Sequence, residues 1–220
     1  MNRVLKALGA LLAYPSDELV AALPEIGALI DLEARLPREA LAELVLLQEE
    51  LGTADLLDAQ ERYVALFDRG RATSLHLFEH VHGDSRDRGP AMVDLKEVYA
   101  RAGLQLAPGE LPDYLPAVLE YLALRPFAEA KEMLGDCAHI LRAVGEALRQ
   151  RGSRYAAVPN ALLLLIGDQP LAAEAPAAAP EPPLDDEWRE EPVFFGPPGG
   201  KGCGAAAPGS APIQFMPRRS

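Results

Sequence analysis

The spacing of apolar residues limits this chain most strongly, because nearly every apolar stretch has the three-and-four-residue repeat of an amphipathic helix. The longest run keeps that spacing over three heptads, through Phe127, Ala130, Leu134, Cys137, Leu141, Val144 and Leu148. No segment shows the alternation of apolar and polar residues that a half-buried strand requires. The pattern therefore predicts an all-α fold, a single multi-helix bundle of about eight or nine helices joined by short loops.

Prolines and glycines divide this pattern into separate helices. The residue before a proline is pushed out of the α region, so a first helix is expected to end before Pro15. Pro24 and Pro37 fit the first turns of new helices, where their missing N–H costs nothing. Phe127–Leu148 is expected to form one continuous helix, followed by a stop at Gly152.

The composition changes abruptly after residue 168. Residues 1–168 are predicted to form the all-helical domain. Residues 169–220 are rich in Ala, Pro and Gly and lose all periodicity, which predicts a disordered tail. Two short apolar islands, Val193–Phe195 and Ile213–Met216, interrupt this tail. They are either docking elements or segments without a role.

The chain is acidic, with 33 acidic and 21 basic residues and a net charge of −12. Residues 1–168 hold 26 acidic and 17 basic residues, a difference of −9, and residues 1–68 alone hold 13 against 5. This balance argues against nucleic acid as a partner. An acidic helical face can instead attract a basic partner, or it can simply keep the chain soluble.

Other features indicate a cytoplasmic protein. Cys137 lies in a helical pattern and Cys203 in a Gly-rich tail, so a disulfide framework is not expected. The apolar run Ala7–Ala13 loosely imitates a signal peptide, but it is short and fits a first core helix better. No apolar stretch approaches the roughly 20 residues that span a bilayer. Direct insertion into a membrane is therefore not expected.

The strongest enzyme-like pattern is His76-Leu-Phe-Glu79-His80, which has the H-x-x-E-H spacing of inverted zinc proteases. On a helix, the two histidines would lie one turn apart and could share a metal, with Glu79 as a base. The alternative is a polar helix face that meets a partner. Phosphate-binding loops, a C-x-x-C pair and a G-x-S-x-G elbow are all missing from the sequence. We therefore expect a chain that is not an enzyme and binds no metal or cofactor stably.

A locally basic segment surrounds these histidines. Its arginines are Arg69, Arg71, Arg86 and Arg88. Their guanidinium groups suit carboxylates or phosphates, and the simpler interpretation is pairing with nearby acidic residues. His82 adds a third histidine, and the three together could respond to pH.

Five segments carry a further signal: residues 63–71 (YVALFDRGR), 74–89 (SLHLFEHVHGDSRDRG), 92–95 (MVDL), 111–122 (LPDYLPAVLEYL) and 11–16 (LLAYPS). Together they resemble the NarJ family of nitrate reductase molybdenum-cofactor assembly chaperones. The resemblance covers roughly residues 4–165. The tail is similar only loosely, through 191–196 (EPVFFG) and 214–219 (QFMPRR).

This resemblance implies an all-helical fold, akin to the chaperones of other molybdoenzymes. It also implies that the chain binds the cofactor-free catalytic subunit of nitrate reductase, including its N-terminal segment. The chaperone would keep that client soluble until the molybdenum cofactor is inserted and prevent premature docking on the membrane subunit. The wider group has a Pro-Asp-His motif, whereas Tyr114 follows Pro112-Asp113 here, so no His-dependent or nucleotide-binding role is carried over.

The residues support such a role independently of the family resemblance, because a basic amphipathic client helix could lie in a groove between acidic helices. We expect this surface along residues 63–68, 76–89 and 113–120. The predicted client-binding residues are Tyr63, Phe67, Asp68, His76, Glu79, His80, Arg86, Arg88, Asp113, Tyr114 and Glu120. The two aromatic residues either line the groove or belong to the core. The alternatives are a metal-dependent hydrolase and a helical adaptor for another client.

Overall fold

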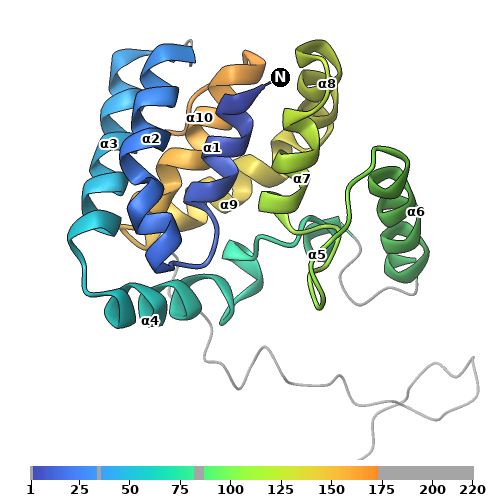
Figure 1. Ribbon diagram of the computed structural model, residues 1–220, viewed down its shortest axis with the longest axis horizontal. Coiled ribbons are helices and arrows are strands. Elements are labelled where there is room, and N and C mark those ends of the chain that lie inside the picture. Colours follow the sequence, from blue (N-terminus) through green and yellow to red (C-terminus); the bar gives the residue numbers. More distant parts are fainter. Residues whose placement is uncertain (1, 34–35, 82–86, 173–220) are drawn as a thin grey trace, which may run out of the picture. The chain divides into compact units, whose positions relative to one another are not determined.

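The computed structural model describes residues 2–33, 36–81 and 87–172, and this part of the chain is all-α (Figure 1). The helices are α1 (Arg3–Leu11), α2 (Asp17–Glu33), α3 (Arg38–Thr53), α4 (Leu56–Phe67), α5 (Leu77–Val81), α6 (Arg88–Arg101), α7 (Leu115–Ala123), α8 (Phe127–Asp136), α9 (Ala138–Gln150) and α10 (Ala157–Ile166). Two 3-10 turns, η1 (Arg71–Thr73) and η2 (Arg154–Ala156), join them. The predicted fold class is confirmed. None of these helices is long and apolar enough to cross a bilayer.

Helix α1 lies in the core and packs against α2, α7 and α10. Leu5, Leu8 and Leu11 are almost completely buried, since the helix is covered on several sides. Gly9 sets the distance between α1 and α7. A Cβ at this position would lie 3.3 Å from the carbonyl oxygen of Pro116, so the two helices approach more closely than a larger residue allows.

Helix α2 runs straight through Pro24, so the prediction that Pro24 begins a new helix is wrong. Leu19, Leu23, Ile26 and Ile30 are buried along one stripe that continues on both sides of the proline. Packing of this stripe stabilises the continuous helix against the loss of one backbone hydrogen bond. Pro37, in contrast, stands immediately before α3, close to its expected place.

The predicted continuous helix over Phe127–Leu148 is also wrong, because the chain turns at Cys137 between α8 and α9. The amides of Ile140 and Leu141 both donate to the carbonyl oxygen of Cys137, at 3.0 Å each. The turn lets both helices pack on α10, which a single straight helix of this length could not do. Periodicity does not register such a break, because the apolar spacing continues across it.

The last helix, α10, begins at Ala157 and follows directly on η2. Beyond it, the chain packs on the domain past the predicted boundary at residue 168. Leu171 is buried against Gly145 of α9, and its amide donates to Oδ1 of Asn160 at 2.9 Å. Residues 173–220, with both apolar islands, lie outside the described residues.

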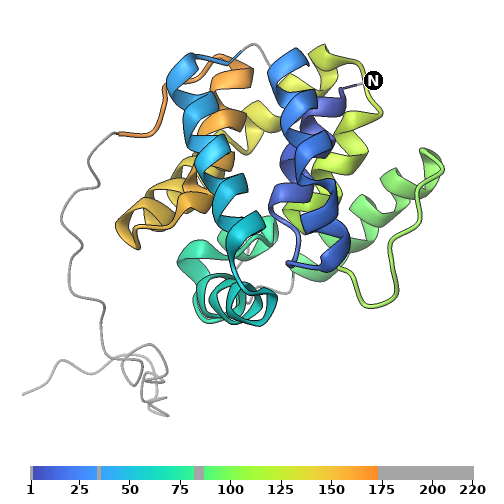
Figure 2. The same ribbon diagram turned by 60° about the vertical axis from the view of Figure 1, so that its left-hand side comes forward.

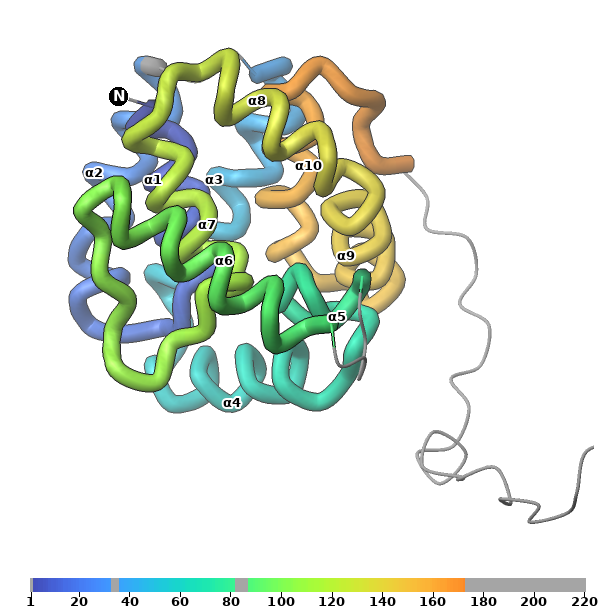
Figure 3. Tube along the Cα trace, turned by 90° about the vertical axis from the view of Figure 1, so that its right-hand side faces the viewer, coloured from blue at the N-terminus to red at the C-terminus, as the bar shows by residue number. Residues whose placement is uncertain are grey.

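Helix α4 lies across the ends of the helices before it in the chain (Figures 1 and 2). Helix α6 lies outside α7, with α5 near its N-terminal end (Figure 3). The ring of Tyr99 on α6 contacts that of Tyr121 on α7, with centroids 5.2 Å apart. The irregular segments around α5 and before α7 therefore meet between α4, α6 and α7, where most of the predicted site residues lie.

Candidate functional site

Two tyrosines from distant segments meet at the centre of the candidate site. Tyr63 comes from α4, and Tyr114 precedes α7. Their hydroxyl oxygens are 2.9 Å apart, and the Tyr63 hydroxyl also donates to the carbonyl oxygen of Leu12 at 2.8 Å. Burial raises the pKa of both phenols, with most effect on Tyr63, so both stay protonated. The pair joins the end of α1 to α4 and α7.

An isolated antiparallel bridge between His76 and Tyr114 organises the next part of the site. The amide of Leu115 donates to the carbonyl oxygen of Leu75 at 2.8 Å, and the amide of Leu77 donates to that of Asp113 at 3.0 Å. The imidazole of His76 therefore lies beside the Tyr114 ring, with centroids 5.4 Å apart. Helix α5 begins directly after this pairing, at Leu77.

Asp113 is completely buried and is the polar centre of the site. Its Oδ1 lies 3.2 Å from Nδ1 of His76, and its Oδ2 accepts the amide of Phe78 at 3.1 Å. A guanidinium nitrogen of Arg88 lies 3.7 Å from Oδ2. A buried carboxylate is tolerated only with such partners. The hydrogen bond to Asp113 raises the pKa of His76, partial burial opposes this, and the charges of Asp113 and Glu79 add to it.

Arg88 connects this buried centre to the surface. The same guanidinium nitrogen that faces Asp113 also pairs with Oε1 of Glu79 at 3.3 Å. The side chains of Arg88 and Glu79 are 25% and 29% exposed, so a partner can reach this edge. We use "the seam" for the connected set Tyr63, His76, Glu79, Arg88, Asp113 and Tyr114. The structure thus brings together six of the eleven predicted client-binding residues.

The remaining predicted residues lie outside the seam or at its margin. Phe67 is buried in an aromatic cluster with Tyr63, their ring centroids being 4.6 Å apart. Asp68 is exposed at the end of α4, and Glu120 is exposed on α7, where it pairs with Lys6 at 3.0 Å. His80 places Nε2 2.9 Å from the carbonyl oxygen of Ser74. Arg86 lies outside the described residues.

The structure differs from the single helix that the H-x-x-E-H metal hypothesis assumed. His76 stands immediately before α5 and belongs to the bridge with Tyr114, whereas His80 lies within α5. Each imidazole also has a nitrogen close to a protein oxygen, from Asp113 or Ser74. Within residues 2–33, 36–81 and 87–172, no group of three or more His, Cys, Asp or Glu side chains could hold a metal ion.

Two further buried tyrosines lie near this site and were not among the predicted residues. Tyr99 donates its hydroxyl to the carbonyl oxygen of Pro112 at 2.7 Å and thereby fixes the segment before Asp113. Tyr155 lies against the aromatic cluster on α4. Neither tyrosine belongs to a motif that marks it as functional.

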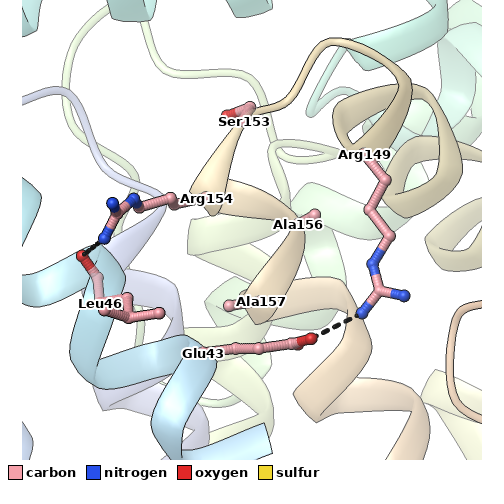
Figure 4. Close-up of a pocket in the computed structure, with 7 residues that line it drawn as sticks. All are labelled: Glu43, Leu46, Arg149, Ser153, Arg154, Ala156 and Ala157. Carbon is pink, nitrogen blue, oxygen red and sulfur yellow. Dashed lines mark hydrogen bonds and ion pairs between the residues drawn. The ribbon is translucent and has the colours of Figure 1, made fainter. Parts of the chain in front are cut away.

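A second feature is a small surface pocket of about 140 Å³ between α3, α9 and η2 (Figure 4). It is lined by Glu43, Leu46, Arg149, Ser153, Arg154, Ala156 and Ala157. Glu43 pairs with Arg149 at 2.9 Å and accepts Nδ2 of Asn160 at 2.8 Å. Arg154 pairs with Glu50 at 3.1 Å. Because the charged groups around this pocket neutralise each other, we assign them to holding α3 against α9 and α10.

Comparisons with known proteins agree with one another. Residues 33–158 match the family described as nitrate reductase delta subunit. The chain is 48% identical over 206 residues to the nitrate reductase molybdenum cofactor assembly chaperone NarJ of Escherichia coli K12, covering 90% of this chain and 86% of that one. It is 41% identical to a probable chaperone of the same kind, NarW, from that strain, covering 88% and 84%.

A crystal structure described as a redox enzyme maturation protein from Archaeoglobus fulgidus is also similar, with a TM-score of 0.54. The similarity covers 76% of this chain and 94% of that one, at 20% identity. At this identity the likeness supports the fold alone. The helical arrangement is therefore shared beyond the range in which the sequences are clearly alike.

Proposed function

This chain belongs to the NarJ family of nitrate reductase molybdenum cofactor assembly chaperones, and from that membership we propose which client it binds and how. It binds the immature catalytic (alpha) subunit of respiratory nitrate reductase in the cytoplasm. It keeps that subunit competent for cofactor insertion and prevents premature docking on the membrane. The observation that carries this proposal is the 48% identity to a named chaperone over 90% of the chain.

The chain acts on its client by binding and carries out no reaction of its own. Its relatives are named as chaperones, in agreement with the expectation that it is not an enzyme. The molybdenum cofactor is the cargo of the client, and the chaperone holds the polypeptide that receives it. The residues of the seam suit this role, since their polar groups mostly bond to one another and hold helices in place.

The client segment we propose is the N-terminal part of the catalytic subunit, bound as a basic amphipathic helix. The accessible edge of the seam offers Glu79, and Asp68 lies exposed at the end of α4. Residues 1–68, which include α1 to α4, hold 13 acidic against 5 basic residues. Charge of this sign raises the encounter rate with a basic segment, and this effect weakens as salt screens it.

The affinity expected for such a complex is modest. Three or four buried apolar anchors would contribute roughly 5–10 kcal/mol, and ordering the client and restricting its motion cost about as much. A chaperone that must release its client needs this balance. We propose that folding of the client around its cofactor buries the bound segment and so drives release.

Calorimetric titration of a synthetic peptide with the client's N-terminal sequence tests this function. We expect saturable binding that weakens between low and high salt, together with weaker binding of the cofactor-loaded subunit than of the cofactor-free one. Equal binding of the two forms would contradict the release mechanism. Active, fully metallated nitrate reductase in cells that lack this chain would contradict the function itself. Co-purification of a different client would instead favour a general helical adaptor.

A further inference from the structure

The hydroxyl group of Tyr155 is a buried donor without an acceptor. Tyr155 lies in η2 and is 7% exposed, and its hydroxyl has no hydrogen-bond partner in the described part of the chain. Burial raises the pKa of this phenol, so the group stays protonated. The buried hydroxyls of Tyr63 and Tyr99, in contrast, donate to carbonyl oxygens at 2.8 and 2.7 Å. A buried polar group that lacks a partner destabilises the state in which it is buried.

Helix α4 packs two aromatic rings against Tyr155. The ring of Tyr155 lies edge-on to the rings of Phe67 and Tyr63, with centroids 5.1 and 6.0 Å apart. Both partners belong to α4, which buries a single row of side chains, Ala59, Tyr63 and Phe67. In Figures 1 and 2, α4 lies across the ends of other helices and not among them.

Residues with extended backbone flank α4 on both sides. They are Ala54 before it and Gly70 after it. Besides the Tyr63 hydroxyl, the side chain of Gln60 holds α4 to the carbonyl oxygen of Pro15 at 2.9 Å, and the hydroxyl of Thr73 in η1 donates to the carbonyl oxygen of Leu66. A helix attached by one row of side chains and a few hydrogen bonds can open without unfolding of the core.

We propose that α4 is a hinged cover over an aromatic floor that includes Tyr155, and that the client's amphipathic helix docks on this floor when α4 lifts. This inference rests on the proposed function, because it specifies the surface that meets the client. The apolar face of the client helix replaces the rings of α4, and a polar group of the client accepts the Tyr155 hydroxyl. Residues 55–68 carry four acidic residues, Asp55, Asp58, Glu61 and Asp68, against Arg62 alone, which suits a basic client.

Removing the Tyr155 hydroxyl is the sharpest test, because it removes the unbonded donor that destabilises the closed state and keeps the aromatic ring. Tyr155→Phe should raise Tm by roughly 2–8 °C and slow amide exchange in α4 by about five- to a hundredfold. If binding requires the open state, the apparent Kd for the client peptide rises by at least the same factor, because the variant also lacks the hydroxyl that the client would accept. Tyr99→Phe is the matched control. It removes a hydroxyl that has an acceptor, so it should lower Tm.

The experiment uses the full chain, with hydrogen exchange followed by mass spectrometry and with the synthetic N-terminal client peptide as the probe. In the wild-type chain, α4 amides should exchange faster than those of α1 and α9. If the α4 amides exchange only together with those of the core, α4 does not open separately and the inference fails. If the Tm of Tyr155→Phe is lower than or equal to that of the wild-type chain, the unbonded Tyr155 hydroxyl is not what destabilises the closed position of α4.

Peptide titration separates this inference from the proposed function. If the wild-type chain binds the peptide and Tyr155→Phe binds it equally well, opening of α4 is not required for client binding and the inference fails. If the wild-type chain does not bind the peptide, the proposed function fails, and the docking half of this inference fails with it. The exchange measurement still decides whether α4 opens.

Discussion

His76 and Asp113 are 37 positions apart in the chain, yet Nδ1 of the imidazole lies 3.2 Å from Oδ1 of a completely buried carboxylate. The same carboxylate accepts the amide of Phe78 and faces Arg88. One side chain thus fixes the start of α5, the start of α6 and the segment before α7. The stability of this part of the fold should depend on the charge of that carboxylate.

Replacement of Asp113 should therefore destabilise the fold strongly. Asp113→Ala leaves Arg88 without its buried counter-charge and the Phe78 amide without an acceptor. A buried donor left without its acceptor costs about 1–3 kcal/mol, and Asp113 is the acceptor for more than one donor. The free energy of unfolding in urea, measured by circular dichroism, checks this. Glu120→Ala is the control, because its exposed pair with Lys6 contributes little and the urea midpoint should barely move.

Stability should also depend on pH through His76. Its pKa is raised in the folded chain, mainly by the hydrogen bond to Asp113, so the folded state binds the proton more tightly than the unfolded state does. The resulting stabilisation is complete below roughly pH 6.5, the ordinary value for histidine, and is lost as pH rises through the folded pKa. Urea unfolding at a series of pH values measures it.

The control for this dependence is His76→Gln, which keeps a polar side chain but cannot take up the proton. The decline in stability above neutrality should be smaller in this variant than in the wild-type chain. Identical pH profiles for the two chains would mean that the charge of His76 does not contribute. The charges of Glu79 and Arg88 also act on this imidazole, in opposite directions.

The hydroxyl pair of Tyr63 and Tyr114 should couple α4 to α7. Tyr63→Phe removes the donor to the Leu12 carbonyl oxygen and should cost about 0.5–1.5 kcal/mol of unfolding free energy. Tyr114→Phe removes the partner in the pair. A double-mutant cycle gives the coupling, and the double variant should lose less than the sum of the single losses. Strict additivity would show that the 2.9 Å contact has no energetic consequence.

Much of the fold follows from local patterns in the sequence. Apolar residues at helical spacing form the buried stripes of α3 and α4, which are Ala40, Leu44, Leu47 and Leu51 on α3 and Ala59, Tyr63 and Phe67 on α4. The breaks were harder to predict. Pro24 does not interrupt α2, whereas the chain turns at Cys137 without any proline. In both cases packing against distant helices decides the outcome, and a local window contains no information about it.

The candidate site shows the same division. The resemblance to a known family led to the seam residues, because the segments similar to that family, 63–71, 74–89 and 111–122, contain all of them. Their arrangement could not be derived from spacing, since His76 leaves the helical pattern to pair with Tyr114. The H-x-x-E-H interpretation assumed that His76 lies within the helix, whereas it stands just before α5. Tyr155 was missed because an unmet hydrogen bond is a property of the packed structure and not of the residue type.

The chain beyond α10 should stabilise the domain through one close contact. A Cβ at Gly145 would lie 2.5 Å from Cδ1 of Leu171, so Gly145→Ala must push this buried side chain out of its place. We expect a loss of about 1–3 kcal/mol, measured by urea unfolding. Adding Leu171→Ala removes the clash, so the double variant should lose less than the sum of the two single losses. If Gly145→Ala were instead stabilising, as expected for an exposed helix position, Leu171 would not be packed there in solution.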